Sequence, residues 1–388
     1  MADGQHIVIL GGGYAGLTAA ARIAEADSGV SVTLIDRKKE FVERIRLHEI
    51  AAGSEPRDLG YQKFMESRGG GFLRGVISSI DLDQQTLEVE GQSALPWDRL
   101  VYALGSHTDT DSVDGVREHA VSLDDMAACK ALYNQLHNAP AGTKVLVVGG
   151  GLTAFEAACE FAERLPGLDI TLAVGTRFAA SDKPGGLSQL AVEHLQNVFE
   201  RLSVKLSVGS RAASLQQGSA TFEGGSAQPF DVCLWAAGFS VPELAKQSGL
   251  SVNDAGQIKS DYTLASISHP NVLTVGDAAE VVVDPSGRCR MSCAAGRPMG
   301  ELAAKTVLGP VMSSANDPFS FGYKMRCVSL GREDGLIQFV DVQDRPIEDV
   351  WIGARAARWK EYVCQRTLQG IGFEVDVGDP PDTPPAQP

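Results

Sequence analysis

Two stretches of the chain repeat one order of patterns: a short apolar run opens into glycines, a helical stretch of small residues follows, and a second apolar run closes the unit. The first unit spans residues 6–36 and the second residues 145–174. The interval from Gly11 to Asp36 equals that from Gly149 to Val174. A strand, a helix and a second strand joined in this order form parallel pairs. The sequence therefore predicts the α/β class, with two doubly wound, Rossmann-like dinucleotide-binding domains.

A second pair of similar segments, residues 97–105 and 230–238, follows the two units. Each starts with polar residues, continues as a buried strand and ends at a glycine, as expected for the strand that closes each domain. One domain is then inserted in the other. Residues 1–107 and 239–309 form the first domain, 108–238 the inserted domain, and 310–375 a small α+β domain with a strand at 336–340. Residues 376–388 hold five prolines and are expected to be a disordered tail.

The first glycine turn reads Gly11-x-Gly13-x-x-Gly16, and Asp36 ends the next apolar run. Glycine at these positions allows a tight turn, brings backbone N–H groups close to a pyrophosphate and lets the helix pack on the strand. The helix N-terminus adds partial positive charge for the phosphates, and the acid accepts hydrogen bonds from a ribose. This context predicts an adenine-dinucleotide site.

The second turn reads Gly149-x-Gly151-x-x-Ala154, but Val174 stands where the first unit has its acid. Arg177 follows shortly afterwards. A missing acid with a nearby arginine suits a ribose 2′-phosphate. We therefore expect NADPH here, with NADH as the alternative and a degenerate site as the third reading.

A third motif, Gly276-Asp277, ends an apolar run and precedes a helix of small residues predicted over 293–307. It places a carboxylate and a helix N-terminus in one crevice, where they can act on a bound cofactor. The alternative is that Asp277 only caps a helix.

Composition excludes several classes of protein. The 49 acidic residues against 34 basic ones give a net charge of −15, which repels phosphate backbones and argues against a nucleic-acid partner. Seven scattered cysteines do not suggest a disulfide framework. The sequence shows no basic leader and no apolar run long enough for a transmembrane segment, so the cytoplasm is the expected compartment. No metal-ligand spacing, serine nucleophile elbow or P-loop was found.

Together these motifs resemble the pyridine nucleotide–disulfide oxidoreductase superfamily over about residues 6–310. Residues 41–53 look like the matching segment of type II NADH:quinone dehydrogenases and of apoptosis-inducing-factor-like and ferroptosis-suppressor-like oxidoreductases. The resemblance implies that the first domain binds FAD and the inserted domain NADPH or NADH. The cofactor-binding residues that we expect are Gly11, Gly12, Gly13, Tyr14, Ala15, Gly16, Asp36, Arg37, Arg46, Ile77, Ala103, Gly105, Gly149, Gly151, Thr153, Arg177, Gly238, Gly276 and Asp277.

The resemblance implies an FAD-dependent NAD(P)H oxidoreductase that passes hydride to flavin and then to a quinone-like or other small conjugated acceptor. Glu156, which would place the nicotinamide, and His48 are the catalytic candidates. Residues 291–299 lack the glutamine-rich quinone-site pattern, and no long membrane-anchoring extension follows the third domain. Two alternatives stay open: a biosynthetic flavoenzyme that oxidises or reduces a specialised metabolite with oxygen or NAD(P) as redox partner, and a nucleotide-binding redox sensor without turnover.

Some features support only weaker hypotheses. Cys289 and Cys293 are four positions apart. This spacing fits a redox-active pair near the flavin, or two small apolar side chains that pack on one side of a helix. Arg44, Arg46 and His48 are expected to border the flavin. The basic segment 354–368 fits a peripheral membrane contact, a dimer contact or a helix packed on the core. The expected assembly is a monomer or a homodimer.

Overall fold

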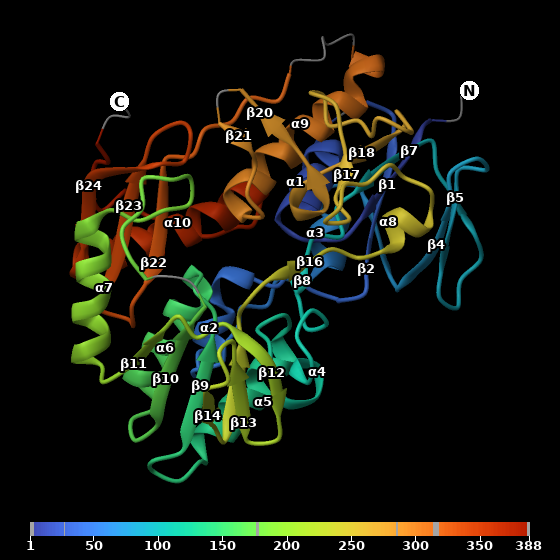
Figure 1. Cartoon of the computed structure of the whole chain (residues 1–388). Coiled ribbons are helices and arrows are strands. Elements are labelled where there is room, and N and C mark those ends of the chain that lie inside the picture. Colours follow the sequence, from blue (N-terminus) through green and yellow to red (C-terminus); the bar gives the residue numbers. More distant parts are fainter. Residues whose placement is uncertain (1–3, 27, 176–177, 285, 313–317, 386–388) are drawn as a thin grey trace.

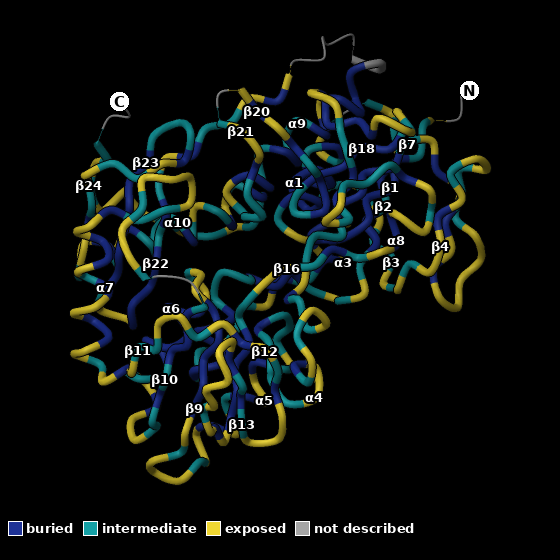
Figure 2. Tube along the Cα trace, in the orientation of Figure 1, coloured by how far each residue is buried: buried dark blue, intermediate teal, exposed yellow. Residues whose placement is uncertain are grey.

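The computed structural model describes residues 4–26, 28–175, 178–284, 286–312 and 318–385. Three units surround a central gap between the ribbons (Figure 1): a lobe that contains β1, a lobe that contains β9, and a C-terminal unit that contains α10. Buried residues run through the middle of each lobe, whereas exposed residues lie mainly at the loops and outer edges (Figure 2).

The first lobe is built on a five-stranded sheet in the order β18-β7-β1-β2-β3. Every neighbouring pair in it is parallel. The strands are β1 (His6–Leu10), β2 (Ser31–Asp36), β3 (Gly71–Arg74), β7 (Arg99–Tyr102) and β18 (Val272–Thr274). The buried valine, isoleucine and leucine residues of β1, β2, β7 and β18 suit a parallel sheet that is covered on both faces, whereas the edge strand β3 has no buried residue.

Helices α1 (Tyr14–Glu25) and α9 (Cys293–Met312) pack together beside this sheet. Small residues let them approach closely: a Cβ added at Gly300 would lie 2.2 Å from the carbonyl oxygen of Ala15. A small antiparallel sheet, β4 (Ile77–Asp81), β5 (Thr86–Val89) and β6 (Leu95–Pro96), and the short helices α3 (Tyr61–Glu66) and α8 (Leu244–Gln247) also belong to the lobe. This packing fixes the helix that starts at the first glycine turn.

The second lobe repeats the design with a four-stranded parallel sheet in the order β11-β10-β9-β15. Its strands are β9 (Lys144–Val148), β10 (Asp169–Val174), β11 (Lys205–Val208) and β15 (Val232–Trp235). Helices α5 (Met126–His137), α6 (Leu152–Arg164) and α7 (Gln189–Arg201) contribute to its core, and a three-stranded sheet, β12 (Ala212–Gln216), β13 (Ser219–Phe222) and β14 (Ala227–Pro229), packs beside it.

The chain leaves the first lobe and returns to it through two adjacent segments. Strand β8 (His107–Thr108) pairs antiparallel with β16 (Phe239–Ser240). The carboxyl ends of both parallel sheets, which carry the glycine turns, lie near this crossing (Figure 1). Ligands of open α/β sheets bind at such ends.

The C-terminal unit consists of an antiparallel sheet and a long helix. The strands are β22 (Met325–Ser329), β23 (Gly335–Val340) and β24 (Pro346–Ile352), and the helix is α10 (Gly353–Ile371). Trp359 of α10 is buried against Trp351 and Phe339 of the sheet. The basic segment 354–368 therefore has an apolar face that is packed on the core.

The predicted fold class is confirmed: two parallel-sheet α/β lobes and a small α+β unit. Element boundaries shift slightly. Strand β2 includes Asp36 as its last residue, and the helix predicted over 293–307 continues to Met312. Of the tail 376–388, residues 376–385 form neither helix nor strand, and 386–388 lie outside the described residues.

Candidate functional site

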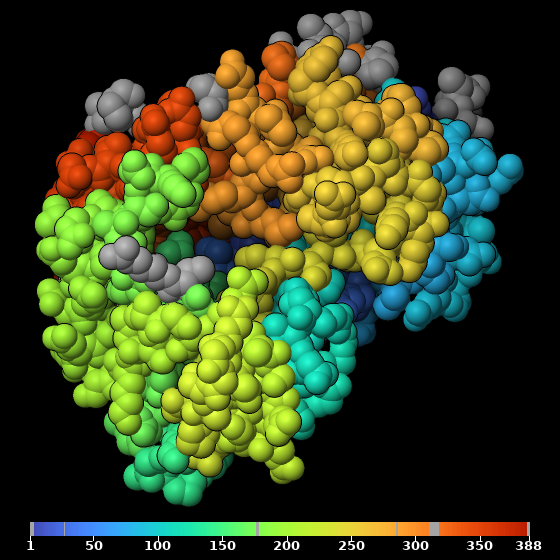
Figure 3. Space-filling model, in the orientation of Figure 1, coloured from blue at the N-terminus to red at the C-terminus, as the bar shows by residue number. Residues whose placement is uncertain are grey.

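Two adjoining cavities lie where the lobes meet. The larger has a volume of about 740 Å³ and the smaller about 250 Å³. Gly13, Arg44, Ala103 and Gly105 line both of them, so the two spaces form one elongated site. Figure 3 shows the surface hollowed between the second lobe and the segment around α9.

The larger cavity follows the first glycine turn. Gly11, Gly12, Asp36, Arg37 and Ile77 line it, as expected for the adenosine and phosphate end of a dinucleotide. The backbone N–H of Gly12 donates to Oδ2 of Asp36 at 2.7 Å, which aims the carboxylate at the turn. The N-terminus of α1 opens into this space, where it favours negative charge.

A different physical reason favours glycine at each of the three positions of this turn. Gly11 has a φ of +96°, which favours glycine. A Cβ at Gly16 would lie 2.0 Å from the carbonyl oxygen of Gly11, so glycine there allows α1 to pack on β1. A Cβ at Gly13 would meet nothing within 4 Å, because this residue faces the cavity. The turn forms a cradle that fits a dinucleotide backbone.

The smaller cavity lies at the start of α9. Tyr14, Ala15, Gly276 and Asp277 line it from the first lobe. The hydroxyl of Ser106 donates to Oδ2 of Asp277 at 2.6 Å, and Asp277 lies in a short 3₁₀ turn, Gly276–Ala278. Burial raises the pKa of Asp277, although Ser106 and Arg44 oppose this effect. The residues suit the polyol and ring end of a flavin dinucleotide, which needs hydrogen-bonding partners in a partly apolar crevice.

The second lobe reaches the same cavity through Thr153, Glu156 and Gly238. Thr153 and Glu156 lie in the first turns of α6, which begins after Gly151. A Cβ at Gly149 would lie 2.6 Å from the carbonyl oxygen of Ala236, so the second glycine turn is also tight. Gly149 and Gly151 do not line either cavity.

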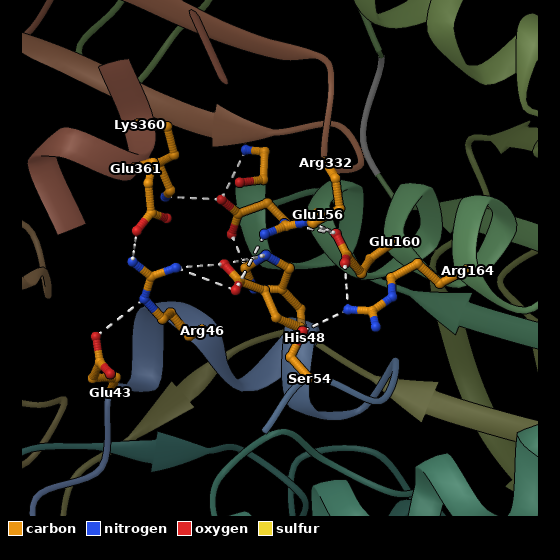
Figure 4. A network of polar contacts seen from close by, with 12 residues as sticks. Glu43, Arg46, His48, Ser54, Glu156, Glu160, Arg164, Arg332, Lys360 and Glu361 are labelled. Carbon is orange, nitrogen blue, oxygen red and sulfur yellow. Dashed lines mark hydrogen bonds and ion pairs between the residues drawn. The ribbon is translucent and has the colours of Figure 1, made fainter. Parts of the chain in front are cut away.

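Glu156 forms a buried ion pair with Lys360, a residue that sequence reasoning missed (Figure 4). Nζ of Lys360 donates to Oε1 of Glu156 at 3.0 Å and to the carbonyl oxygen of Cys327 at 3.2 Å. The backbone N–H of Ser329 also donates to Oε1 of Glu156. Burial alone would raise the pKa of Glu156, but Lys360 and His48 outweigh it and hold the pKa below its ordinary value. The pair places a fixed cation and a fixed anion on the cavity wall.

His48 lines the cavity from α2 (Leu47–Ile50) and is 2% exposed. Its Nδ1 atom lies 4.0 Å from Oε2 of Glu156. Burial lowers the pKa of His48, despite the nearby carboxylates of Glu156 and Glu49. The imidazole is therefore neutral at pH 7. The two catalytic candidates thus lie next to each other at the cavity.

Arg46 occupies a different place from the one expected. Its guanidinium pairs with Glu43, Glu49 and Glu361 and lines neither of the two cavities. Arg44 has the position expected of a cofactor contact, since it borders both cavities and donates to the carbonyl oxygen of Ser106 at 2.7 Å. The two arginines alternate along the short η1 turn, Arg44–Arg46, and the sequence did not show which one faces inward.

The two candidate redox cysteines lie in different surroundings. Cys293 lines the smaller cavity, whereas Cys289 is buried in the core of the first lobe. Both are free thiols. Burial raises the pKa of Cys289 to about 11 and also raises that of Cys293, so both remain protonated at pH 7. The reactive thiolate form is therefore disfavoured.

Arg177, expected at the second dinucleotide site, lies outside the described residues. Val174, at the end of β10, is buried and apolar, so it offers no hydrogen bond to a ribose. Within the part of the chain that the structure describes, no helix has both the length and the apolar character needed to cross a bilayer.

Comparisons with known proteins match this arrangement. Residues 5–300 match the family described as pyridine nucleotide-disulphide oxidoreductase. An NADH dehydrogenase-like protein of Mycobacterium tuberculosis is 27% identical over 325 residues, which cover 78% of this chain and 80% of the relative. A type II NADH:quinone oxidoreductase of Staphylococcus aureus is 25% identical over 399 residues, which cover 95% and 96%. The solved structure of NDH2 from Plasmodium falciparum in complex with NADH has a TM-score of 0.79 at 14% identity and covers 95% of this chain and 96% of that one.

Proposed function

Because the chain belongs to the pyridine nucleotide-disulphide oxidoreductase family, we propose that it is an FAD-dependent enzyme that oxidises NADPH or NADH and reduces a quinone-like or other small conjugated acceptor. Membership of this family identifies the chain as an enzyme, a flavin oxidoreductase that uses NAD(P)H. The identity of the flavin, the choice of nicotinamide and the acceptor are the proposed parts.

FAD fits the elongated site better than a flavin without the adenosine part. The site continues from the smaller cavity into the larger one, where the first glycine turn and Asp36 could hold an adenosine and its phosphates. We propose that Asp36 and the backbone of Gly11–Gly13 and Ile77 hold the adenosine and pyrophosphate, with Arg37 and Arg44 beside them. Asp277 and Ser106 would hold the polyol. Bound there, a flavin would supply the redox chemistry, and the residues of the two glycine turns would orient it against the nicotinamide.

The nicotinamide is proposed to enter from the second lobe. Gly149, Gly151, Thr153 and Gly238 would bind it, and Glu156 would orient its ring. NADPH is favoured over NADH because the end of β10 carries Val174 in place of an acid and Arg177 follows in the sequence. Binding of two planar cofactors against each other accelerates hydride transfer mainly through proximity.

The single observation that supports this function most strongly is the pair formed by Glu156 and Lys360 on the wall of the cavity. A quinone-like acceptor develops negative charge on its oxygens as it takes electrons, and a fixed ammonium stabilises such charge. The type II NADH:quinone oxidoreductase of Staphylococcus aureus, similar over nearly the whole chain, supports a quinone acceptor.

The test combines a spectrum with stopped-flow kinetics. The purified protein, reconstituted with FAD if necessary, is expected to be yellow and to bleach anaerobically on mixing with NADPH. Reoxidation by menadione is then compared with reoxidation by air. Fast reoxidation by the quinone supports the proposal. Reoxidation by air alone would favour the biosynthetic alternative, and no bleaching by either nicotinamide would overturn the proposal in favour of a redox sensor.

Three further assignments are proposals as well. The pairing of β8 with β16 supports a boundary at residues 107–108 and 238–239, so that 1–107 and 239–309 form the FAD domain, 108–238 the NAD(P)H domain and 310–375 the C-terminal domain. The seven free thiols are consistent with the reducing cytoplasm as the compartment. A monomer or homodimer remains the proposed assembly.

A further inference from the structure

The hydroxyl of Tyr61 holds the first glycine turn from outside the turn. Tyr61 is the first residue of α3 and is 2% exposed. Its Oη atom donates to the carbonyl oxygen of Gly12 at 2.7 Å. Burial, Asp36 and Glu40 raise the pKa of Tyr61 well above its ordinary value, so the hydroxyl keeps the proton that it donates. The carbonyl group of Gly12 therefore has a fixed direction.

The ring of Tyr61 is held in place by its neighbours. A Cβ added at Gly12 would lie 2.5 Å from Cζ of Tyr61, so the ring lies directly against the backbone of the turn. The ring also contacts Phe72 of β3, with 5.3 Å between the two ring centroids. The backbone N–H of Tyr61 donates to the carbonyl oxygen of Lys39 at 3.0 Å, which ties the start of α3 to the segment after β2.

Gly12 is fixed at both of its backbone polar groups. Its N–H donates to Oδ2 of Asp36 at 2.7 Å, and its carbonyl oxygen accepts from Tyr61. A trans peptide is planar, so its N–H points opposite to its carbonyl group. The N–H of Gly13 belongs to the same peptide as the carbonyl of Gly12. It therefore points away from the hydroxyl of Tyr61.

The N–H of Gly13 is the group that this arrangement prepares for a ligand. Gly13 lines both cavities, and its N–H has no hydrogen-bond partner among the residues that the structure describes. Backbone N–H groups at the start of a helix bind phosphate in turns of this kind. A peptide that is already oriented binds more tightly than one that must first be ordered.

We propose that Tyr61 is a positioning residue for the flavin dinucleotide: its hydroxyl orients the peptide between Gly12 and Gly13 so that the N–H of Gly13 meets the pyrophosphate. This inference rests on the proposed function, because it concerns the site assigned to FAD. Tyr61 lies outside the glycine motif and outside the residues expected from the sequence. Its effect should extend to ligands that carry the pyrophosphate and not to those that carry only the adenosine.

The first test measures binding to the full chain freed of flavin, without turnover. The protein is titrated with FAD, and the affinities of ADP and adenosine are measured by competition with FAD. In Tyr61→Phe the dissociation constants of FAD and ADP are expected to rise about 3- to 10-fold, the usual range for one neutral hydrogen bond. The constant for adenosine is expected to change less than twofold, because adenosine has no phosphate to meet the N–H of Gly13.

A second readout uses the full chain loaded with FAD. The two phosphorus atoms of the bound cofactor give ³¹P signals that respond to hydrogen bonds at the pyrophosphate, and these signals are expected to shift in Tyr61→Phe. Thr306→Val is the matched control. It also removes a buried hydroxyl that donates to a backbone carbonyl, that of Thr263, but it lines neither cavity. Its expected effect is on stability alone.

Gly12→Ala reaches the same contact from the other partner. The added methyl group would displace the ring of Tyr61 and break the hydrogen bond. Adding Tyr61→Phe to Gly12→Ala should therefore change the dissociation constant of FAD less than twofold further. If Tyr61→Phe does not fold, Gly12→Ala takes its place in the comparison of ADP with adenosine.

The outcomes distinguish the two proposals. Wild-type protein that binds no FAD contradicts the proposed function itself. Wild-type protein that binds FAD, with unchanged constants for FAD and ADP in Tyr61→Phe, overturns the role of Tyr61 alone. An equal rise of the constants for ADP and adenosine also overturns it, because that result would show a general loss of the site instead of a misplaced N–H group.

Discussion

Nζ of Lys360 lies 3.0 Å from Oε1 of Glu156, although the two residues are 204 positions apart in the chain. One belongs to the C-terminal helix and the other to the helix of the second glycine turn. Both are mostly buried at the cavity wall. The C-terminal unit therefore contributes directly to the proposed site.

Lys360→Met should leave the Glu156 carboxylate buried without its cation. We expect the free energy of unfolding to fall by about 3–5 kcal/mol at pH 7, the usual cost of removing one partner of a buried pair. The pKa of Glu156 should rise at the same time, because Lys360 is the main group that lowers it. Chemical denaturation measures the loss of stability.

The double variant Glu156→Gln with Lys360→Met should recover part of this stability, and Lys305→Met on the exposed side of α9 serves as the control. The pKa of Glu156 is lower in the folded protein than in the unfolded chain. Ionised Glu156 therefore contributes to the free energy of unfolding above about pH 4.5, and this contribution is lost as the pH falls through the pKa of the folded state. An equal loss in Lys360→Met at pH 7 and at pH 3 would contradict this account.

Glu160 should make the fold less stable as the pH rises. Its side chain is 0% exposed, and burial raises its pKa to about 7 even though Arg332 pairs with it. A carboxyl with a raised pKa favours the fold while it is protonated, so this contribution is lost between pH 4.5 and about 7. Glu160→Gln should gain about 2 kcal/mol relative to wild type between pH 5 and pH 8.

Denaturant titrations of both proteins at pH 5, 6.5 and 8 measure this difference. Glu200→Gln, an exposed residue of α7, should show no such trend. A constant difference between Glu160→Gln and wild type across the three pH values would argue against a titrating Glu160.

Gly13→Ala should separate cofactor binding from folding. The added Cβ meets no protein atom within 4 Å and the backbone there is extended, so stability without flavin should change by less than about 0.5 kcal/mol. The methyl group points into the space assigned to the pyrophosphate. We expect the bound flavin per protein, read from visible absorbance, to fall severalfold.

Gly71→Ala on β3 is the matched control, because its Cβ meets only ordinary contacts and faces neither cavity. Full retention of FAD in Gly13→Ala would show that the cofactor does not pass this glycine.

Arg177→Ala should weaken the use of NADPH more than that of NADH, because only NADPH carries a 2′-phosphate. We expect kcat/KM for NADPH to fall about tenfold or more, with NADH changing less than twofold, in line with a charged hydrogen bond of about 1.5–3 kcal/mol. Lys246→Ala, an exposed change in the first lobe, is the control. Equal losses for both nucleotides would contradict a role in recognising the phosphate.

Local sequence patterns were enough to predict the two lobes. In each lobe an apolar strand leads into a glycine turn and then into a helix, and this order is typical of a parallel α/β unit. Asp36, Gly276 and Asp277 could be placed for the same reason: they follow strands whose carboxyl ends meet at one edge. Lys360 could not, because nothing near it in the sequence shows that this position of α10 meets Glu156. Arg44 and Arg46 show a second limit, since a single 3₁₀ turn decides which of them faces the cavity.

The C-terminal unit is tied to both lobes. Arg22 of the first lobe donates to the carbonyl oxygen of Gly370, and Arg332 in the hairpin between β22 and β23 pairs with Glu160 of the second. The unit thus braces the two lobes against each other and helps to fix the distance between the two glycine turns. Truncating α10 would therefore remove both the tie at Gly370 and the cation of the cavity wall, Lys360, even with every glycine turn intact.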